Sequence, residues 1–282
     1  MIKIVSDTTT GLTRERASKM GVDLVSQVVN FGAETLRDGV DITNEIFLQR
    51  LKMSKEFPTT SQPPVGDFVD VFKNHLAAGH EVLCITVSSH LSGTYNSAQQ
   101  AKQQLGSDNI TVVDSKTVAA SEALIVMEAV HLAAAGKSMA EIVSVLDRWI
   151  AGMKLDFVLD TLEYLVKGGR ASSLQGFLGT LLQMKPVLTI RHGTGKIEAL
   201  ERIRTKAKAH ARLREIVDEA VSGKSRIHMG VTHVGLLAEA EALAQEFRRK
   251  YNLAECPVIE MPPAVAAHAG PGALGATYYV DN

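Results

Sequence analysis

The chain has 282 residues, of which 45% are hydrophobic and 22% charged, a composition typical of a soluble globular protein with one large or two ordinary domains. Its 30 Lys and Arg and 31 Asp and Glu leave a net charge of -1, which gives no electrostatic case for a nucleic-acid partner or an anionic membrane as the main partner. Two distant cysteines, Cys84 and Cys256, exclude a disulfide framework and a Cys-x-x-Cys metal site.

The N-terminal segment MIKIVSDTTT is typical of a first strand and not of a signal peptide. No window approaches the ~20 apolar residues that a membrane span needs. We therefore expect a cytoplasmic protein.

In the first half, short apolar runs of strand length alternate with helical patterns. The predicted strands are residues 2–5, 24–29, 82–87 and 110–113, and a turn at 31–34 leads from the second of them into an antiparallel partner. The predicted helices begin at Thr13, near Ile46, near Phe68 and after Ser92, and two more lie within 119–150. The segment 58–64 contains three prolines and predicts a rigid, non-helical loop.

Two consecutive helices without an intervening strand interrupt this alternation, so we expect a second unit from Leu155 onward. Its predicted strands are residues 157–159, 187–191, 197–200, 227–231, 258–259 and 276–280, and the turn at 192–195 predicts a hairpin. The sequence thus predicts two α/β domains, the first, 1–154, with a mostly parallel sheet and the second, 155–282, with a mixed or antiparallel one. The segment 55–80 is a candidate for packing with the second domain.

Hydroxyl-rich loops follow three of the predicted strands, at residues 6–10, 88–94 and 114–116. The carboxyl ends of parallel strands share one edge of a sheet, so we expect these loops to converge on one ligand site. Ser92, Gly93 and Thr94 stand at a helix start, where free backbone N–H groups bind anions. Simple N-capping by Ser92 explains the same residues equally well.

Two further elements offer donors for an anionic group. Arg170 follows the pair Gly168-Gly169 just past a helical pattern, where a guanidinium can reach a carboxylate or phosphate, although a capping Gly pair with an exposed Arg is the simpler interpretation. His268 opens a glycine-rich turn before the last strand. Neither a phosphate-binding glycine loop nor a histidine or calcium-loop metal motif is present in the sequence.

Arg202, Arg204, Lys206 and Lys208 form the densest basic run in the chain. A strand leaving at Leu200 projects Arg202 and Arg204 to one side. A solvated basic face and a docking patch for an acidic protein surface both fit this run.

Six ordered blocks of residues resemble motifs of the DegV family, from the first strand to the last. They are Ser6-Asp7-Thr8, Thr60-Ser61-Gln62-Pro63, Ser89 to Tyr95, Thr161 to Leu165 with Gly168-Gly169-Arg170, Lys185-Pro186, and His268 to Gly272. The resemblance implies two α/β domains that enclose one fatty acid in a tunnel between them. It also implies that the protein is the binding subunit of a bacterial fatty acid kinase, which presents the carboxylate to a separate ATP-dependent subunit that forms the acyl phosphate.

By position, the resemblance implies that the carboxylate is bound by Thr60, Ser61, Ser92, Gly93, Thr94, Arg170 and His268. Leu178, Leu181, Leu182 and Met184 are candidates for lining the tunnel, and ordinary core residues fit the same pattern. Arg202 and Arg204 become candidates for docking the kinase subunit. No catalytic residue, metal or cofactor is expected, and ligand exchange is compatible with a transient membrane contact.

Two other functions compete with this interpretation. The first is an acyl-lipid sensor or carrier whose occupied state engages a regulatory partner. The second is an acyl hydrolase with Ser92 as nucleophile and His268 as base, which the absence of a Gly-x-Ser-x-Gly motif around Ser92 disfavours.

Overall fold

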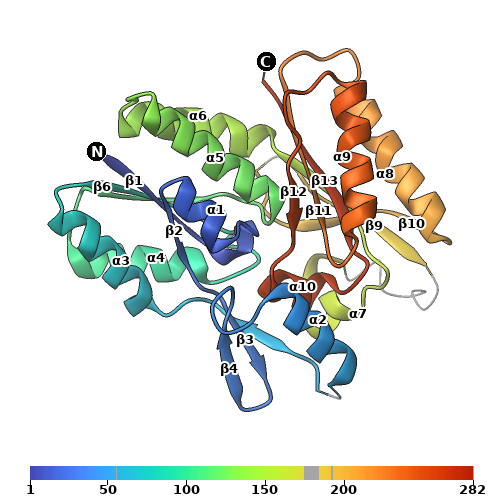
Figure 1. Ribbon diagram of the computed structural model, residues 1–282, viewed down its shortest axis with the longest axis horizontal. Helices are drawn as coiled ribbons and strands as arrows, with labels where there is room; N and C mark the ends of the chain where they lie inside the picture. Colours follow the sequence, from blue (N-terminus) through green and yellow to red (C-terminus); the bar gives the residue numbers. More distant parts are fainter. Residues whose placement is uncertain (55, 175–183, 192, 282) are drawn as a thin grey trace.

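The computed structural model describes residues 1–54, 56–174, 184–191 and 193–281. Within these residues the strands form three sheets, and helices cover and separate the two larger ones (Figure 1). The two-domain α/β fold class predicted from the sequence is confirmed. The domain limits at 154 and 155 stay a prediction.

The first sheet has the strand order β2-β1-β6-β7, and all its neighbouring strands are parallel. Its strands are β1 (Ile2–Asp7), β2 (Val22–Val25), β6 (Glu81–Thr86) and β7 (Ile110–Asp114). β6 is an almost continuous apolar run with five successive buried residues, as expected for a parallel strand covered on both faces. The parallel sheet predicted for the first half is therefore confirmed.

The second sheet is mixed, with the order β10-β9-β8-β13-β11-β12. Its strands are β8 (Lys154–Val158), β9 (Lys185–Arg191), β10 (Ile197–Ile203), β11 (Ile227–His233), β12 (Val258–Glu260) and β13 (Leu274–Val280). Within the described part of this second sheet, β11–β12 is the only parallel pair. The antiparallel pairing of β9 with β10 confirms the predicted hairpin.

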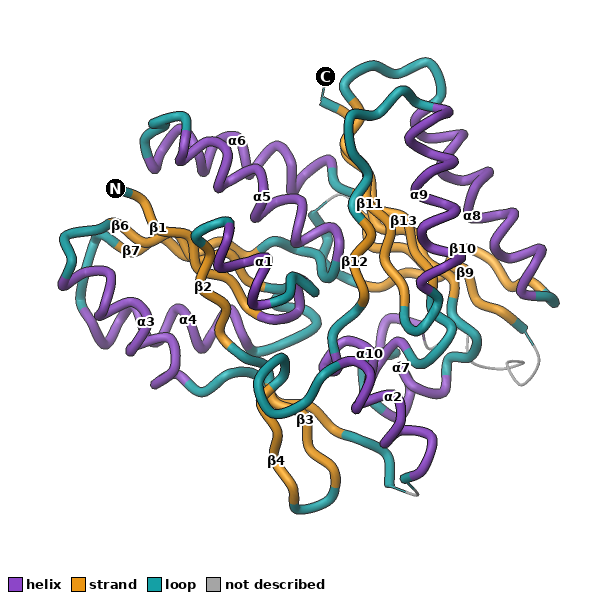
Figure 2. The backbone as a smooth tube through the Cα atoms, viewed as in Figure 1, coloured by secondary structure: helices purple, strands orange, loops and turns teal. Residues whose placement is uncertain are grey.

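Helices and sheets alternate as layers across the molecule (Figure 2). α3 (Val65–Ala77) and α4 (Thr94–Leu105) cover the outer face of the first sheet. α1 (Arg14–Lys19), α5 (Ala120–Ala134) and α6 (Met139–Gly152) pack on its other face, and α5 and α6 also contact the second sheet. α8 (Lys206–Val221) and α9 (Leu237–Lys250) cover the far side of that second sheet. One layer of helices is thus shared by both sheets.

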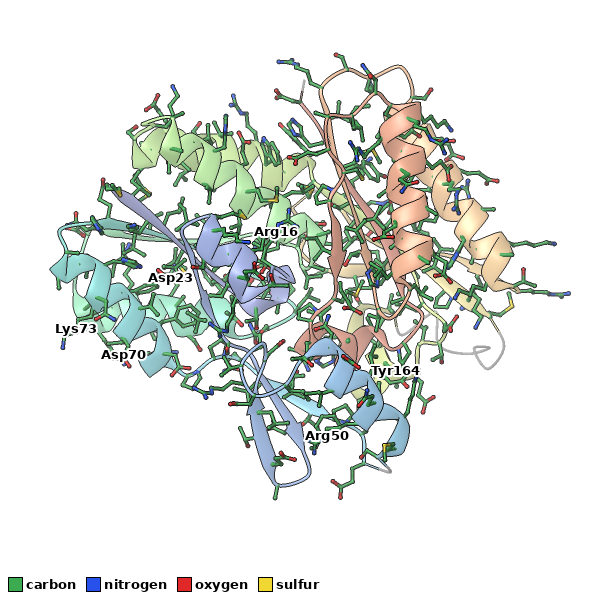
Figure 3. All side chains as sticks on the ribbon, in the orientation of Figure 1. Arg16, Asp23, Arg50, Asp70, Lys73 and Tyr164 are labelled. Carbon is green, nitrogen blue, oxygen red and sulfur yellow. The ribbon has the colours of Figure 1, made fainter. Side chains whose placement is uncertain are left out.

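α3 shows how the sequence sets these layers. Phe68 and Phe72, one helical turn apart, are fully buried against the first sheet, and each contributes about 1.5–3 kcal/mol of burial. Asp70 and Lys73 occupy its exposed outer face (Figure 3). Gly79 takes the left-handed conformation, with φ of 74°, just past the end of the helix.

A small antiparallel sheet, β4-β3-β5, projects at the lower edge in Figure 1 and corrects two predictions. It contains β3 (Val28–Phe31), β4 (Glu34–Arg37) and β5 (Thr59–Ser61). The single strand predicted at 24–29 is wrong, because the chain leaves the first sheet at Val25 and enters this sheet at Val28. The segment predicted as a loop at 58–64 is non-helical, but it includes β5, which pairs with β3.

Three short helices close the space between this small sheet and the second sheet. They are α2 (Asn44–Met53), α7 (Glu163–Lys167) and α10 (Pro263–Ala269), and a 3-10 turn, η1 (Thr8–Thr10), lies beside α10. Their apolar residues join β3, β8 and β9 in one buried cluster. No helix in the described part of the chain is both long and apolar enough to cross a membrane.

Candidate ligand-binding site

A pocket of about 720 Å³ of empty space, including its open mouth, lies between the two larger sheets. Both halves of the chain contribute to it, which agrees with the predicted ligand site between the domains. The lining residues are Thr9, Gln27, Thr60, Val87, Leu91, Ser92, Val118, Leu155, Phe157, Leu165, Arg170, Ile190, Ile197, Met261, Ala264, Val265, His268 and Ala269.

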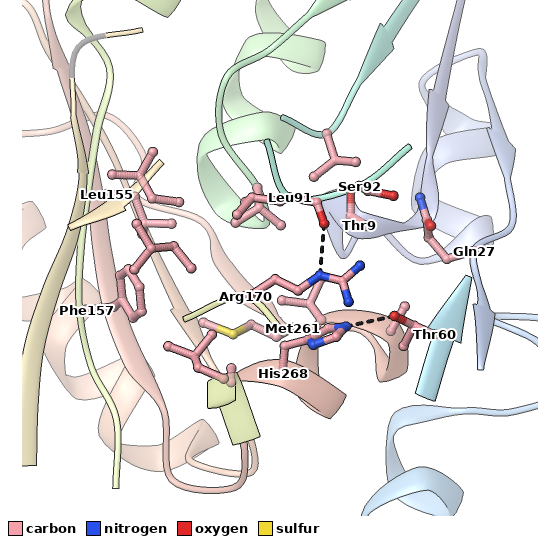
Figure 4. A pocket seen from close by; sticks show the side chains of 18 residues that line it. Thr9, Gln27, Thr60, Leu91, Ser92, Leu155, Phe157, Arg170, Met261 and His268 are labelled. Atoms are coloured by element: carbon pink, nitrogen blue, oxygen red, sulfur yellow. Dashed lines mark hydrogen bonds between the residues drawn. The ribbon is translucent and has the colours of Figure 1, made fainter. Parts of the chain in front are cut away.

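The pocket is polar at one end and apolar at the other (Figure 4). Thr9, Gln27, Thr60 and Ser92 gather on one side of Arg170, whereas Leu155 and Phe157 of β8 form part of the opposite wall. Such a division suits an amphipathic ligand with a small polar head and a long apolar tail.

The parallel first sheet builds the polar end. The Val87 N–H, just after β6, donates to Asp7 at the end of β1, and the Ser89 N–H donates to Asp114 at the end of β7. The three hydroxyl-rich loops therefore meet at one edge of the sheet, but only those at 6–10 and 88–94 line the pocket, and residues 114–116 do not. Their meeting follows from the parallel pairing, which puts the carboxyl ends of β1, β6 and β7 at one edge.

His268 lies on α10 and its Nε2 is 2.7 Å from the Thr60 hydroxyl of β5. Burial, followed by the nearby Arg170 charge, lowers the pKa of His268 to about 3, so the imidazole is neutral at pH 7. Its Nδ1 lies against Gly168, where a Cβ would collide with the ring. Gly168 is thus required for the approach of α7 to α10, whereas a Cβ at Gly169 would meet no atom within 4 Å.

Arg170 spans the two halves of the site. Its Nε donates to the Leu91 carbonyl at 3.1 Å and its Nη1 donates to the Gly168 carbonyl at 2.6 Å. Burial lowers the pKa of the guanidinium from its ordinary value. Nη2 has no hydrogen bond to any residue that the structure describes, and it remains available to a ligand.

The structure brings together four of the residues predicted to bind a carboxylate, namely Thr60, Ser92, Arg170 and His268. Ser61 is exposed, because alternation along β5 turns it away from the face of Thr60. Gly93 packs against the Gln62 side chain, and a Cβ at this position would lie 2.9 Å from the Gln62 amide. Thr94 is fully buried behind Ser92, with their hydroxyl oxygens 2.8 Å apart.

The apolar wall comes from β8, β9, β10, α7 and α10. Leu155, Phe157, Leu165 and Ile190 are buried members of it. Of the residues predicted to line a tunnel, Leu178, Leu181 and Leu182 lie outside the described residues. Met184 is half-buried just before β9 and does not line the described pocket.

The basic residues predicted to dock a partner do not line the pocket. Arg202 is half-buried within β10, and Arg204 is exposed just past its end. β10 enters the pocket wall at Ile197, so Arg202 stands roughly 17 Å further along the strand at ~3.3 Å per residue.

Two buried polar residues at this site, Gln27 and Glu122, were missed by the sequence predictions. Gln27 donates to Asp7 and Thr94, and Thr9 contacts both Asp7 and Glu122. Glu122 is a fully buried carboxyl on the apolar helix α5, and a lone acid early in such a helix is the signal that could have identified it. Gln27 carries no comparable signal.

Ser92 and His268 have different hydrogen-bond partners in the described site. His268 bonds Thr60, while the Ser92 hydroxyl bonds Thr94, so the serine and the histidine do not form a nucleophile–base pair. No group of three or more His, Cys, Asp or Glu in the described ranges is placed to hold a metal ion.

Known proteins are similar to this chain in sequence and fold over almost their full length. A DegV domain-containing protein of Listeria monocytogenes is 36% identical over 99% of both chains. The solved structure described as fatty acid binding of a DegV family protein from Thermus thermophilus has a TM-score of 0.92 and 33% identity, covering 99% of each chain. A stearic acid-binding protein from Eubacterium ventriosum has a TM-score of 0.89 and 29% identity over 99% of this chain and 98% of its own. The sequence model of the DegV family matches residues 1–281, and the chain belongs to that family.

Proposed function

We propose that this protein binds a long-chain fatty acid in the pocket between its two larger sheets. The observation that carries the proposal is the division of that pocket into a polar end with Thr60, Ser92, Arg170 and His268 and an apolar wall. A carboxylate needs several convergent donors, and an alkyl chain needs apolar surface. The fatty acids named for the Thermus and Eubacterium proteins support the same ligand class.

The energetics favour a long chain. Burying roughly 14 to 16 methylenes at ~0.8 kcal/mol each contributes about 11 to 13 kcal/mol before costs. Ordering the chain and desolvating the carboxylate reduce that value. A long-chain ligand therefore retains enough net affinity to survive purification, whereas a short-chain acid does not.

The protein acts in this proposal as a carrier in the cytoplasm and not as a catalyst. It presents the bound carboxylate to a separate ATP-dependent kinase subunit, which forms the acyl phosphate, and it needs no cofactor of its own. The resemblance to the binding subunits of bacterial fatty acid kinases supports this role. The lack of a Ser92–His268 pair in the described site agrees with a carrier.

Mass spectrometry of the denatured protein tests the ligand. We expect a fatty acid of about 16 to 18 carbons in stoichiometric amount. Thr60→Ala should weaken the affinity of the delipidated protein for palmitate by ~1–3 kcal/mol, the range for a lost hydrogen bond to a charged group. Ser61→Ala is the matched control, because the neighbouring Ser61 is exposed and outside the lining. A protein that is always empty and gains no thermal stability from any fatty acid would contradict the proposal.

Arg204→Ala tests the presentation to a kinase. Because Arg204 is exposed and outside the pocket lining, its loss should leave palmitate binding unchanged and reduce acyl phosphate formation by a reconstituted kinase subunit. The defect should shrink at high salt, where charge steering is already screened. Arg202→Ala should act in the same direction, and Lys224→Ala, past the end of α8, serves as the charge-matched control. Normal turnover of both arginine variants at every salt concentration would leave these residues as a solvated face.

A further inference from the structure

Behind the polar end of the pocket lies a buried hydrogen-bond network of Asp7, Thr9, Gln27, Thr94 and Glu122, here called the Asp7 network. All five side chains are buried, and three of them are fully buried. Thr9 and Gln27 also reach the pocket lining (Figure 4). Because buried polar groups are hydrogen-bonded almost without exception, the protons within the network can be assigned by counting the donors and acceptors that contact each other.

The Thr9 hydroxyl lies between two carboxyl groups. Its oxygen is 2.6 Å from Asp7 Oδ1 and 2.7 Å from Glu122 Oε2. A hydroxyl carries one proton and can donate to only one of these carboxyls. The other contact requires that the second carboxyl itself carry a proton and donate to the Thr9 oxygen.

The donors around each carboxyl decide which of the two is protonated. Asp7 accepts from the Val87 N–H at 3.0 Å, from the Thr9 N–H at 2.9 Å and from the Gln27 amide at 3.0 Å. Burial raises the pKa of Asp7, but these three N–H donors stabilise its carboxylate form and oppose the rise. Glu122 has only hydroxyl neighbours, and its burial beside the Asp7 charge raises its pKa well above the usual range. Glu122 is therefore the neutral acid, and Asp7 is ionised.

The ionised Asp7 fixes the orientation of the Gln27 amide. The Gln27 nitrogen must face Asp7, because a carboxylate accepts and does not donate. The second hydrogen on that nitrogen then points to the Thr94 hydroxyl oxygen, 2.8 Å away. Thr94 is fully buried, so its own proton needs a partner, and within the described structure the Ser92 hydroxyl at 2.8 Å is the one in reach.

Ser92 is the end of this chain of donors. It accepts from the Thr94 hydroxyl and, at 3.4 Å, from the Thr94 N–H. Its own proton is left to point into the pocket that it lines. We infer that Gln27 and Thr94 are positioning residues, which hold the Ser92 hydroxyl as a donor to the ligand carboxylate. This inference rests on the fatty-acid function proposed above.

Gln27→Glu tests the direction of the chain with an isosteric change. The introduced carboxylic acid, in its neutral form, donates its proton to Asp7 from the oxygen that replaces the amide nitrogen, and the same oxygen accepts from Thr94. Ser92 must then donate to Thr94 and is lost to the ligand. We expect palmitate affinity to fall by about 10- to 100-fold, as for Ser92→Ala. In the Ser92→Ala background the same Gln27→Glu change should cost less than about threefold, because the hydroxyl that it reorients is gone.

The double-mutant cycle separates positioning from a general effect of charge or folding. A charge on the introduced carboxyl group, or a loosened pocket, would weaken binding equally with and without Ser92, and equal losses in both backgrounds would overturn the inference. Thr94→Ser and Thr94→Val provide a second test. The Thr94→Ser variant keeps a hydroxyl and should bind palmitate within about threefold of the unchanged protein, whereas the Thr94→Val variant should not. If the unchanged protein and Ser92→Ala bind palmitate equally, the inference fails while the fatty-acid function stands. If the unchanged protein binds no fatty acid, the function itself fails.

Discussion

His268 illustrates how burial sets the protonation of a single residue at the site. Its pKa falls to about 3 because the folded protein desolvates the imidazole and places Arg170 nearby. In the unfolded chain a histidine titrates near 6.5. Between these two values the unfolded state binds a proton that the folded state does not. The contribution of the neutral His268 to the free energy of unfolding is therefore fully present above pH 6.5, and it is lost as the pH falls toward 3.

We expect His268→Gln to flatten the acid side of the stability curve. Between pH 6.5 and pH 5 the His268 linkage costs the unchanged protein about 2 kcal/mol, at ~1.4 kcal/mol per pH unit, and the Gln variant is spared this loss. Urea unfolding at a series of pH values, in the absence of fatty acid, measures the difference. Parallel curves for the two proteins would show that His268 is already charged in the folded state.

The residues of the site differ in how far the sequence could predict them. Thr60, Ser92, Arg170 and His268 stand in recognisable motifs, and the structure brings them to one pocket. Gln27 stands in no motif, and its role depends on Asp7 and Thr94, which are 20 and 67 residues away in the chain. Long-range contacts of this kind leave no local pattern, which is why the Asp7 network required the structure.

At the scale of elements, the β9–β10 hairpin links the two halves across the site. The Ser88 hydroxyl, just after β6, donates to the Gly195 carbonyl at 2.8 Å. Gly195 has a φ of 70°, and a Cβ there would collide with the Ser88 hydroxyl oxygen. The hairpin therefore approaches the first half of the chain through a position that accepts only glycine.

Gly195→Ala should weaken this contact and reduce both stability and palmitate affinity. The left-handed backbone costs an alanine about 1–2 kcal/mol, and the collision with Ser88 adds to it. Gly193→Ala is the matched control, because Gly193 has a similar φ of 63° but its nearest neighbour would lie 3.7 Å from a Cβ. Chemical denaturation and palmitate titration of both variants separate the two effects. Equal losses would mean that the close approach to Ser88 contributes nothing.

The elements themselves were largely predictable, because buried parallel strands are continuous apolar runs and the helices show apolar residues one turn apart. The break between β2 and β3 could not be predicted from the sequence. There the Gln27 N–H donates to the Thr8 hydroxyl and the Ser26 hydroxyl donates to the Asp38 carbonyl, so tertiary bonds replace the strand pairing that a continuous strand would have had. An apolar pattern reports burial and cannot report which sheet a strand joins.

For the whole molecule, the shared layer of α5 and α6 implies that the two larger sheets unfold together. Trp149 of α6 stacks on Tyr279 of β13, with ring centroids 4.7 Å apart. The Cβ-free Gly152 of the same helix lies directly against the Tyr279 ring. Trp149 is the one tryptophan of the chain, so its fluorescence reports on the contact between α6 and the second sheet.

We expect urea unfolding followed by Trp149 fluorescence and by far-ultraviolet circular dichroism to give one coincident transition. Neither sheet can expose the shared helical layer without losing a face of its core, so the two unfold as one cooperative unit. Palmitate at 100 times its dissociation constant should raise the free energy of unfolding by about 2.7 kcal/mol. Both midpoints should therefore move upward together, because the pocket draws residues from both halves. Tyr279→Ala should lower both midpoints, with Tyr95→Ala, on the far helix α4, as the control. A fluorescence transition that precedes the loss of helix signal would show instead that the sheets separate before either unfolds.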